Sequence, residues 1–132
     1  MQPQENKNYM ILDCALCLAC QGHYPNERSY SMIKLTVLYG HPTNVQEFET
    51  YYADTHLPIA AKMKGVDRLE LTRFAPGADG AQPAYYRMAE LYFPTEEQMQ
   101  TTMSSPEGEA TVADLPKFAT GGVTVLAGSV QS

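Results

Sequence analysis

His56 has the residue type and the sequence context expected for proton transfer. It follows a segment with helical spacing and precedes Pro58 by two positions. An imidazole titrates near neutral pH, so it can act as a general base or acid on an acidic C–H or an enol. Alternatively, His56 only caps the carbonyls at a helix end and complements the helix dipole. Tyr52, four residues earlier on the same predicted face, could orient the imidazole, donate to a substrate oxygen, or simply pack in the core.

Glu90 is the third candidate catalytic residue. A partly buried carboxyl group among phenols can have a raised pKa that suits acid-base chemistry. Glu90 is equally suited to an ion pair with Lys34 or Arg68 across a sheet. We predict that the pocket around these groups is completed by a substrate-binding set consisting of Tyr86, Phe74, Phe118, Leu38 and Thr36.

No established cofactor motif is present, and no cofactor is expected. Gly121-Gly122 lacks the spacing of a phosphate-binding loop, and neither a Walker pattern nor a nucleophile motif occurs. A divalent metal held by His41, His56 and Glu90 is chemically conceivable, but its geometry is not specified by the sequence. We therefore predict no metal site, and haem binding remains a minor alternative.

Length and charge narrow the classes of partner. The chain has 132 residues, which fits one domain, and a formal net charge of -6, which disfavours nucleic acid because phosphate binding relies on Lys and Arg. No segment has the composition of a membrane span, so no membrane partner is expected. Nine tyrosines with no tryptophan suit a pocket for small, partly aromatic or carbonyl-bearing molecules, although they also suit ordinary amphipathic packing.

The first 31 residues differ from the rest of the chain. They contain all three cysteines, Cys14, Cys17 and Cys20, whose C-x2-C-x2-C spacing lacks the fourth thiolate of an iron-sulfur cluster. Leu18-Ala19-Cys20 resembles a lipoprotein cleavage site, but the segment lacks a positively charged start. We predict a disordered or accidental extension, with Met32 as an alternative start, attached to a cysteine-free cytoplasmic domain at 32–132.

Hydrophobic spacing after Met32 predicts strands and helices in the order β-α-β-β-α-β. Capping signals begin helices at Asn44, Thr95 and Ser105, and the first helix is expected to end near His56, before Pro58. The predicted strands cover residues 33–39, 68–72, 85–93 and 123–126, with a short helix at 59–64 and a loop at 75–80. This order is typical of the ferredoxin-like fold, an α+β arrangement with both helices on one face of a four-stranded antiparallel sheet.

Alternation within the strands assigns each residue to one face of the sheet. The apolar face should meet the helices and form the core; it comprises Ile33, Leu35, Val37, Leu69, Leu71, Ala89, Leu91, Phe93, Val123 and Val125. The opposite face mixes charges with large apolar groups and includes Lys34, Thr36, Leu38, Phe74, Tyr86, Met88, Glu90, Tyr92 and Leu126. We predict that a second copy of the chain covers this mixed face and encloses the pocket; an uncovered face with scattered apolar groups is the alternative.

Three segments together resemble the EthD family. They are Tyr51-Tyr52-Ala53-Asp54-Thr55-His56-Leu57-Pro58, the strand Tyr85–Phe93, and the tail from Ser104 through Val123. The resemblance covers Met32 to about Val130. It implies the dimeric α+β barrel superfamily, whose members include cofactor-free oxygenases, muconolactone isomerases, polyketide cyclases and haem-handling enzymes. Because these proteins share a cavity and not one reaction, the resemblance implies no particular chemistry.

Two functions follow as expectations. The first is a cofactor-independent monooxygenase, isomerase or cyclase that acts on a small hydrophobic or aromatic catabolite, with His56 as acid or base. The second is a noncatalytic homodimer that binds a small ligand or supports a partner enzyme in a degradation pathway. Turnover of a bound small molecule would distinguish the first from the second.

Overall fold

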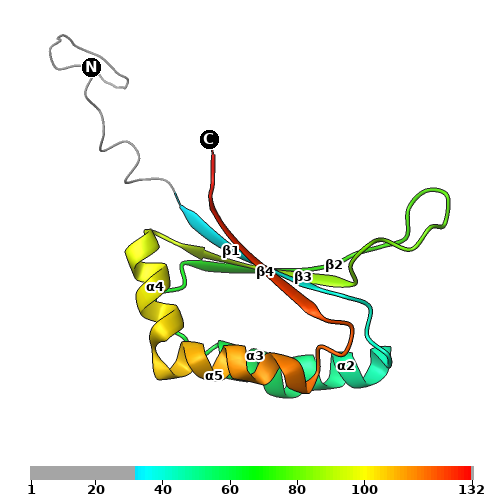
Figure 1. Cartoon of the computed structure of the whole chain (residues 1–132), viewed down its shortest axis with the longest axis horizontal. Helices are drawn as coiled ribbons and strands as arrows, with labels where there is room; N and C mark the ends of the chain where they lie inside the picture. Colours follow the sequence, from blue (N-terminus) through cyan, green and yellow to red (C-terminus); the bar gives the residue numbers. More distant parts are fainter. Residues whose placement is uncertain (1–31, 132) are drawn as a thin grey trace, which may run out of the picture. The chain divides into compact units, whose positions relative to one another are not determined.

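The computed structural model describes residues 32–131, so the predictions made for residues 1–31 lie outside the described residues. Along the chain, the described elements are β1 (Ile33–Tyr39), α2 (Val45–Tyr51), the π-helical turn η2 (Tyr52–His56), α3 (Leu57–Ala60), β2 (Arg68–Arg73), β3 (Arg87–Phe93), α4 (Glu96–Ser104), α5 (Pro106–Asp114), the 3₁₀ turn η3 (Leu115–Lys117) and β4 (Val123–Ser129). The helices lie on one side of the sheet (Figure 1). Within the described range, no helix is long and apolar enough to cross a membrane.

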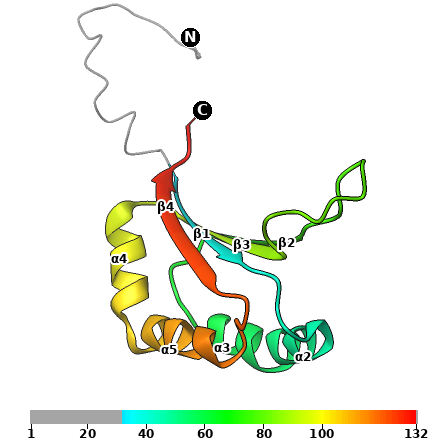
Figure 2. The same ribbon diagram turned by 45° about the vertical axis from the view of Figure 1, so that its right-hand side comes forward.

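The four strands form one antiparallel sheet in the order β2-β3-β1-β4. The central strands β1 and β3 pair Val37 with Ala89, and β4 pairs with the other edge of β1 so that Val37 lies opposite Val125. Figure 2 shows the helices beneath the same face of this twisted sheet. The predicted ferredoxin-like α+β fold is confirmed.

The three predicted helix starts are confirmed by their capping bonds. The side chain of Asn44 accepts a hydrogen bond from the backbone N–H of Glu47 at 3.0 Å, and Thr95 does the same for Gln98. Ser105 Oγ accepts from the N–H of Gly108 at 3.1 Å and also donates to a carbonyl of the preceding helix. Each cap satisfies an N–H that has no partner within its own helix, which fixes where the helix begins.

The prediction that the first helix ends before Pro58 is wrong. Helical backbone continues through α3, because the turn before the proline widens into a π turn in which the N–H of Leu57 donates to the carbonyl of Tyr52. A proline lacks an N–H and its ring collides with the carbonyl four residues earlier in a regular α-helix. The wider π turn of η2 accommodates the missing N–H and the proline ring, and it places Tyr52 and His56 on the buried side of the helix.

Other element boundaries differ modestly from the predictions. The predicted helix at 59–64 is α3, which spans Leu57–Ala60. The third strand begins at Arg87 and not at residue 85, although the N–H of Tyr86 already donates to the carbonyl of Tyr39 at 2.8 Å. The last strand extends to Ser129 because its pairing with β1 continues along the whole of that strand. None of these differences changes the topology.

The core lies between the central strands and the helices. Phe93, Tyr39, Phe48 and Tyr52 are the largest fully buried side chains. The predicted core face is correct for β1 and β3 but only partly for the edge strands. Four of its members are substantially exposed: Leu69 at 43%, Leu71 at 39%, Val123 at 37% and Val125 at 49%. These side chains belong to edge strands, which the helix layer covers less completely than the centre of the sheet.

The opposite face of the sheet is partly covered by its own charged side chains. Lys34 Nζ pairs with Glu90 at 2.9 Å. Arg68 lies over the ring of Tyr92 at 3.9 Å, and Lys34 lies 5.7 Å from the same ring centroid, which explains why Tyr92 is 8% exposed. Leu126 on β4 remains 55% exposed. This face therefore carries both satisfied charges and an uncovered apolar group.

A close approach of two glycines holds β1 against the segment that leads into β4. A Cβ on Gly40 would collide with the carbonyl oxygen of Gly121, and one on Gly121 would collide with that of His41. Gly122 has a φ of 93°, which favours glycine, and its carbonyl accepts from the N–H of Gly40 at 2.9 Å. Gly121 and Gly122 therefore let the segment before β4 lie directly beside the end of β1.

Candidate functional site

A cavity of about 310 Å³ lies between the sheet and the helices. This volume is at the lower end of the range for small-molecule sites, roughly 300–1,000 Å³. Its walls are mostly aliphatic. The lining residues that matter most to its chemistry are His56, Tyr52, Tyr39, Thr111 and Asp67; Arg68 borders the cavity, but its guanidinium lies on the opposite face of the sheet, over Tyr92. The cavity therefore suits a small, largely apolar molecule.

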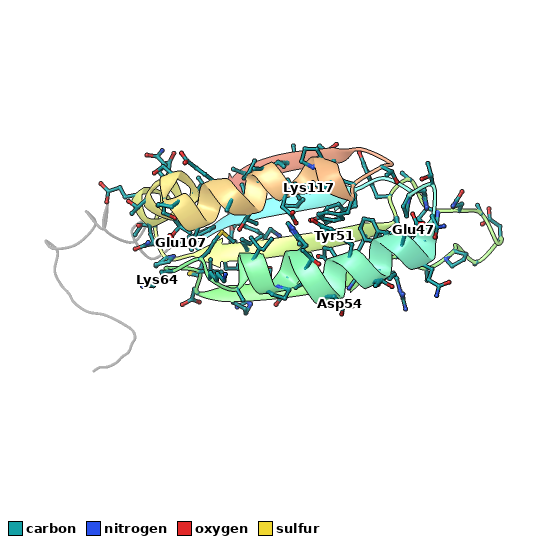
Figure 3. All side chains as sticks on the ribbon, turned by 90° about the horizontal axis from the view of Figure 1, so that it is seen from below. Glu47, Tyr51, Asp54, Lys64, Glu107 and Lys117 are labelled. Carbon is teal, nitrogen blue, oxygen red and sulfur yellow. The ribbon has the colours of Figure 1, made fainter. Side chains whose placement is uncertain are left out.

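His56 is held at the cavity wall by a carboxylate. Its Nδ1 lies 2.9 Å from Oδ2 of Asp114, the last residue of α5. Tyr51 donates its hydroxyl to the other carboxylate oxygen, Oδ1, at 2.7 Å. Figure 3 shows Tyr51 on the side of α2 that faces α5. His56 and Asp114 are only 4% and 3% exposed, so this pair is shielded from water, whereas Tyr51 is half-buried.

The ionisation of Asp114 fixes the tautomer of His56. Burial by itself raises the pKa of Asp114, but the hydrogen bonds from Tyr51 and His56 outweigh it, and the pKa lies below its usual value. An ionised carboxylate can only accept hydrogen bonds, so Nδ1 of His56 must carry the proton that it donates. The lone pair is then on Nε2, the ring nitrogen left to meet a molecule in the cavity. A carboxylate on Nδ1 also stabilises the imidazolium that forms when Nε2 takes up a proton.

Aromatic rings surround the imidazole. The ring of Tyr52 stacks against it with a centroid distance of 5.7 Å and an interplanar angle of 22°, and Phe118 approaches to 4.6 Å. Tyr39 contacts Tyr52 edge to face at 5.6 Å. Burial is the main effect that raises the pKa of both Tyr39 and Tyr52. Both phenols therefore keep their protons near neutral pH and can act as hydrogen-bond donors.

Three of the predicted site residues lie together: His56, Tyr52 and Phe118. Tyr86 packs edge to face on Phe48 and donates its hydroxyl to Glu49, which also accepts two hydrogen bonds at 2.9 Å from Arg87. Tyr86 does not line the cavity. The predicted association of Tyr86 with Glu90 through strand parity is therefore not observed, because Tyr86 precedes the regular part of β3 and bonds toward α2.

Four other predicted site residues do not share a pocket with His56, which corrects the expectation. Thr36 and Leu38 alternate with the cavity-lining Leu35 and Val37, so they project from the opposite face of the sheet. Glu90 pairs with Thr36 in the ladder and takes Lys34 as its ionic partner on that opposite face. Phe74 follows the end of β2 and does not line the cavity. The error arose because the imidazole was assigned to the mixed face, whereas η2 turns it toward the core.

Water is accordingly excluded from His56 by the chain's own helices and sheet, and not by a second copy as predicted from the sequence. The alternative in which His56 caps helix-end carbonyls is also not observed, since the helical backbone continues past it. Nor do the three residues considered for a divalent metal come together: among residues 32–131 no group of three or more metal-binding side chains is assembled. His41 instead contacts the carbonyl of Pro83 at 2.7 Å.

Sequence reasoning missed Asp114 and Tyr51. One signal could have revealed Asp114: it ends a helix, where the negative end of the helix dipole disfavours a carboxylate. An acidic residue at such a position requires compensation, here from two donors on another helix. Tyr51 could have been found only together with Asp114, since neighbouring tyrosines in the helix give no sign of which one bonds the carboxylate.

These features define a ferredoxin-like α+β protein with an apolar cavity and a carboxylate-bound histidine between its sheet and helices. The pattern of the EthD domain matches residues 41–122. An uncharacterized 11.0 kDa protein of Rhodococcus erythropolis, from the thcB-thcC intergenic region, is 34% identical over 95 residues, which cover 72% of this chain and 91% of the relative. The crystal structure of an EthD-family protein from Bacillus halodurans is 33% identical, covers 76% of this chain and 99% of its own, and superposes with a TM-score of 0.71. The chain belongs to the EthD family.

More distant structures share the fold alone. A hydroxynitrile lyase from Passiflora edulis is 10% identical with a TM-score of 0.64, covering 78% of this chain and 96% of its own. SnoaB, a cofactor-independent oxygenase from Streptomyces nogalater, is 16% identical with a TM-score of 0.51, covering 78% and 93%. A protein from Bacteroides fragilis that is described as dimeric is 13% identical with a TM-score of 0.56, covering 75% and 96%. The fold thus accommodates different chemistries.

Proposed function

We propose that the chain binds a small hydrophobic or aromatic catabolite in the cavity and transfers a proton on it through Nε2 of His56. The observation that carries this proposal is the buried Asp114–His56 hydrogen bond, supported by Tyr51, at the wall of an apolar cavity. A histidine held by a carboxylate in a dry site is a recurrent arrangement for general acid-base catalysis.

The proton transfer needs no cofactor. Nε2 removes a proton from a carbon next to a carbonyl, the C–H electron pair becomes the carbon-carbon double bond of an enolate, and the negative charge moves to the carbonyl oxygen. The new imidazolium is stabilised by ionised Asp114, which lies 2.9 Å from Nδ1. Return of the proton to another carbon gives isomerisation, attack of the enolate on a second carbonyl gives cyclisation, and reaction with molecular oxygen as co-substrate gives oxygenation.

Exchange of a carbon-bound proton for deuterium tests the shared first step. The probe is 2-tetralone, a neutral and mostly apolar ketone with an acidic C–H, followed by proton NMR in heavy water. We expect the full-length protein to accelerate exchange and His56→Gln to reduce the acceleration by about 100-fold or more, since a positioned base contributes roughly 10² to 10⁴. His41, which is half-buried and does not line the cavity, serves as the control: His41→Gln should leave the exchange rate unchanged.

Two outcomes would contradict the proposal. Exchange that persists at the wild-type rate in His56→Gln would show that the imidazole is not the base. Binding of the ketone with exchange no faster than in buffer would favour the second function, a noncatalytic protein that holds a small ligand or supports a partner enzyme.

We also propose that two copies associate through the mixed face of the sheet, in a cytoplasmic setting. Leu126 is 55% exposed on this face, and contact with a second copy would bury it. Lys34 and Glu90 of the same face already pair with each other, so that contact would leave neither charge without a partner. This pairing would stabilise the fold from the side opposite the cavity and would not contribute the walls around His56.

A further inference from the structure

We propose that the cavity is an elongated site for an unbranched chain. The ligand is then a neutral carbonyl compound whose carbonyl end lies at His56 and whose apolar chain lies along the strands toward Val66 and Met103. This inference rests on the proposed function and specifies its substrate class. It assigns to Val66 and Met103 the role of setting how long a chain the site accepts.

The sheet side of the cavity is long. Its lining includes three alternate residues of β1, namely Leu35, Val37 and Tyr39. Because a strand rises about 3.3 Å per residue, the wall from Leu35 to Tyr39 extends about 13 Å. A cavity of only about 310 Å³ that reaches along this whole wall has to be narrow. Its shape therefore favours an extended molecule over a compact one.

The helical side of the cavity runs in the same direction as the sheet side. Tyr52, His56 and Ala60 all line the cavity, and they recur at every fourth position of one continuous helical segment, so they lie on one face of it. The ring of Tyr52 lies 5.6 Å from that of Tyr39, the last residue of β1, and 5.7 Å from that of His56. Both walls therefore extend lengthwise, and His56 lies near the Tyr39 end.

The end of the cavity near His56 is closed by aromatic rings. Tyr39, Tyr52 and Phe118 pack with centroid distances of 5.6, 5.7 and 5.8 Å, and they are 1%, 1% and 4% exposed. A chain attached to a carbonyl at His56 has no room on that side. It must therefore extend toward the other end of the cavity.

The far end of the cavity is lined by Met63, Val66 and Met103. Val66 directly precedes Asp67, whose N–H donates to the carbonyl of Tyr92 at 2.7 Å, and Tyr92 lies opposite the first half of β1. Methionine side chains are flexible and fill irregular space around apolar groups. This end of the cavity therefore suits the terminus of an alkyl chain.

The charges around the far end favour a neutral chain. Asp67 lines the cavity there with an exposed side chain. In the described part of the chain, the basic residue that borders the cavity besides His56 is Arg68, and its guanidinium lies on the opposite face of the sheet, 3.9 Å from the ring of Tyr92. A carboxylate at the end of the ligand chain would meet a like charge and no counter-charge, which is unfavourable.

A series of methyl ketones measures the length of the site. In isothermal titration calorimetry with the full-length chain, affinity should rise from 2-butanone through 2-hexanone to 2-octanone by about threefold to fourfold for each added methylene. Val66→Phe shortens the far end, so it should weaken 2-octanone by about tenfold and leave 2-butanone unchanged. Val45→Phe, at an exposed position outside the cavity, should change neither affinity.

Met103→Ala gives a second variant that does not depend on adding a bulky side chain. It lengthens the far end, so it should raise the ratio of the affinities for 2-decanone and 2-octanone by about threefold or more. Thermal unfolding of each variant without ligand shows whether it is folded before it is titrated. An unchanged ratio in folded Met103→Ala would overturn the inference, as would equal losses of affinity for all ketones in folded Val66→Phe.

Two further probes test the direction and the charge of the chain. 4-Octanone has the same formula as 2-octanone but carries carbon chains on both sides of its carbonyl, so its deuterium exchange should be accelerated about tenfold less. 7-Oxooctanoate carries a carboxylate at the far end of the same chain and should bind about tenfold more weakly than 2-octanone. Equal exchange of the two octanones would contradict the closed end near His56, and equal binding of the carboxylate would contradict the neutral chain.

The outcomes separate this inference from the proposed function, because the affinities require no turnover. If His56→Gln abolishes exchange while affinity does not rise from 2-butanone to 2-octanone, the elongated site is wrong and the base is right. If affinity depends on chain length and on Val66→Phe as expected while His56→Gln still catalyses exchange at the full rate, the elongated site stands and the base is wrong. If wild-type protein binds none of the ketones, both are overturned.

Discussion

Asp114→Asn tests the central hydrogen-bonded chain with a nearly isosteric change. The carboxylate is 3% exposed and accepts hydrogen bonds from Tyr51 Oη at 2.7 Å and His56 Nδ1 at 2.9 Å. An asparagine keeps one acceptor oxygen, but its NH₂ group then faces the other donor, and the charge that strengthened both bonds is lost. Hydrogen bonds to charged groups contribute about 1.5–3 kcal/mol each, so we expect the free energy of unfolding to fall by about 2–3 kcal/mol.

A loss of that size is measurable by thermal unfolding. For a domain of about 100 residues, 1 kcal/mol shifts the melting temperature by roughly 4–8 °C, so Asp114→Asn should melt roughly 10–20 °C below the wild type at pH 7. Circular dichroism at 222 nm follows the transition. Asp54→Asn is the matched control, because Asp54 lies in the adjacent π turn with an exposed side chain. Its effect should stay within about 0.5 kcal/mol, as for most surface changes.

The same prediction can be tested by how the stability difference between the wild type and Asp114→Asn changes with pH. The pKa of Asp114 in the folded protein lies below the usual value of 3.8 because of its two hydrogen bonds, although burial opposes this. A carboxyl group with a lowered folded-state pKa contributes stability that is fully present above the unfolded-state pKa and is lost as the pH falls through the folded-state pKa. The difference between wild type and Asp114→Asn in urea unfolding should therefore be constant from pH 7 to about pH 5 and shrink below pH 3.8.

Two results would refute this reasoning. The first is a melting temperature of Asp114→Asn within about 2 °C of the wild type at pH 7, since it would mean that the two bonds add no net stability. The second is a wild-type advantage that stays unchanged, or grows, as the solution is acidified below pH 3.8. Either result would also remove the argument that Asp114 is ionised and directs the proton of His56 to Nδ1.

The remaining predictions concern the helix cap and the mixed face of the sheet. Ser105→Ala should reduce the free energy of unfolding by about 1 kcal/mol, because the N–H of Gly108 loses its acceptor. Ser104→Ala, at an exposed helical position, should change that free energy little. Urea unfolding measures both variants, and equal effects would contradict the capping argument. In sedimentation velocity at micromolar concentration, Leu126→Glu should convert a dimer to a monomer. Val45→Glu, at a position that is similarly exposed at 50%, should leave the dimer intact. A monomeric wild type would contradict the proposed pairing.

The fold was predictable because its signals are local. Alternation in β1 and β3 and the caps at Asn44, Thr95 and Ser105 specify elements whose order permits few topologies. The structure confirms all three caps and the antiparallel sheet. The helix boundary at Pro58 failed because a proline usually ends a helix, and the π turn that tolerates it here has no comparable sequence signal.

The candidate site was only half predictable. His56 and Tyr52 could be proposed from residue type and helical spacing, whereas their partner Asp114 is 58 positions away from His56 in the sequence. Glu90 was the acidic residue chosen from strand parity, yet it pairs with Lys34 on the other face. Sequence patterns assign residues to faces within one element but do not specify how a helix is rotated against the sheet.

The sequence by itself therefore determined the order of strands and helices, their caps, and the histidine on the first helix, since each depends on neighbours within a few residues. Only the tertiary structure decided that His56 faces the core and that α5 brings Asp114 to its Nδ1. Those features depend on contacts between elements that are distant in the chain. Their geometry is set by how the helices pack on the sheet, which is a property of the whole fold and not of any one segment.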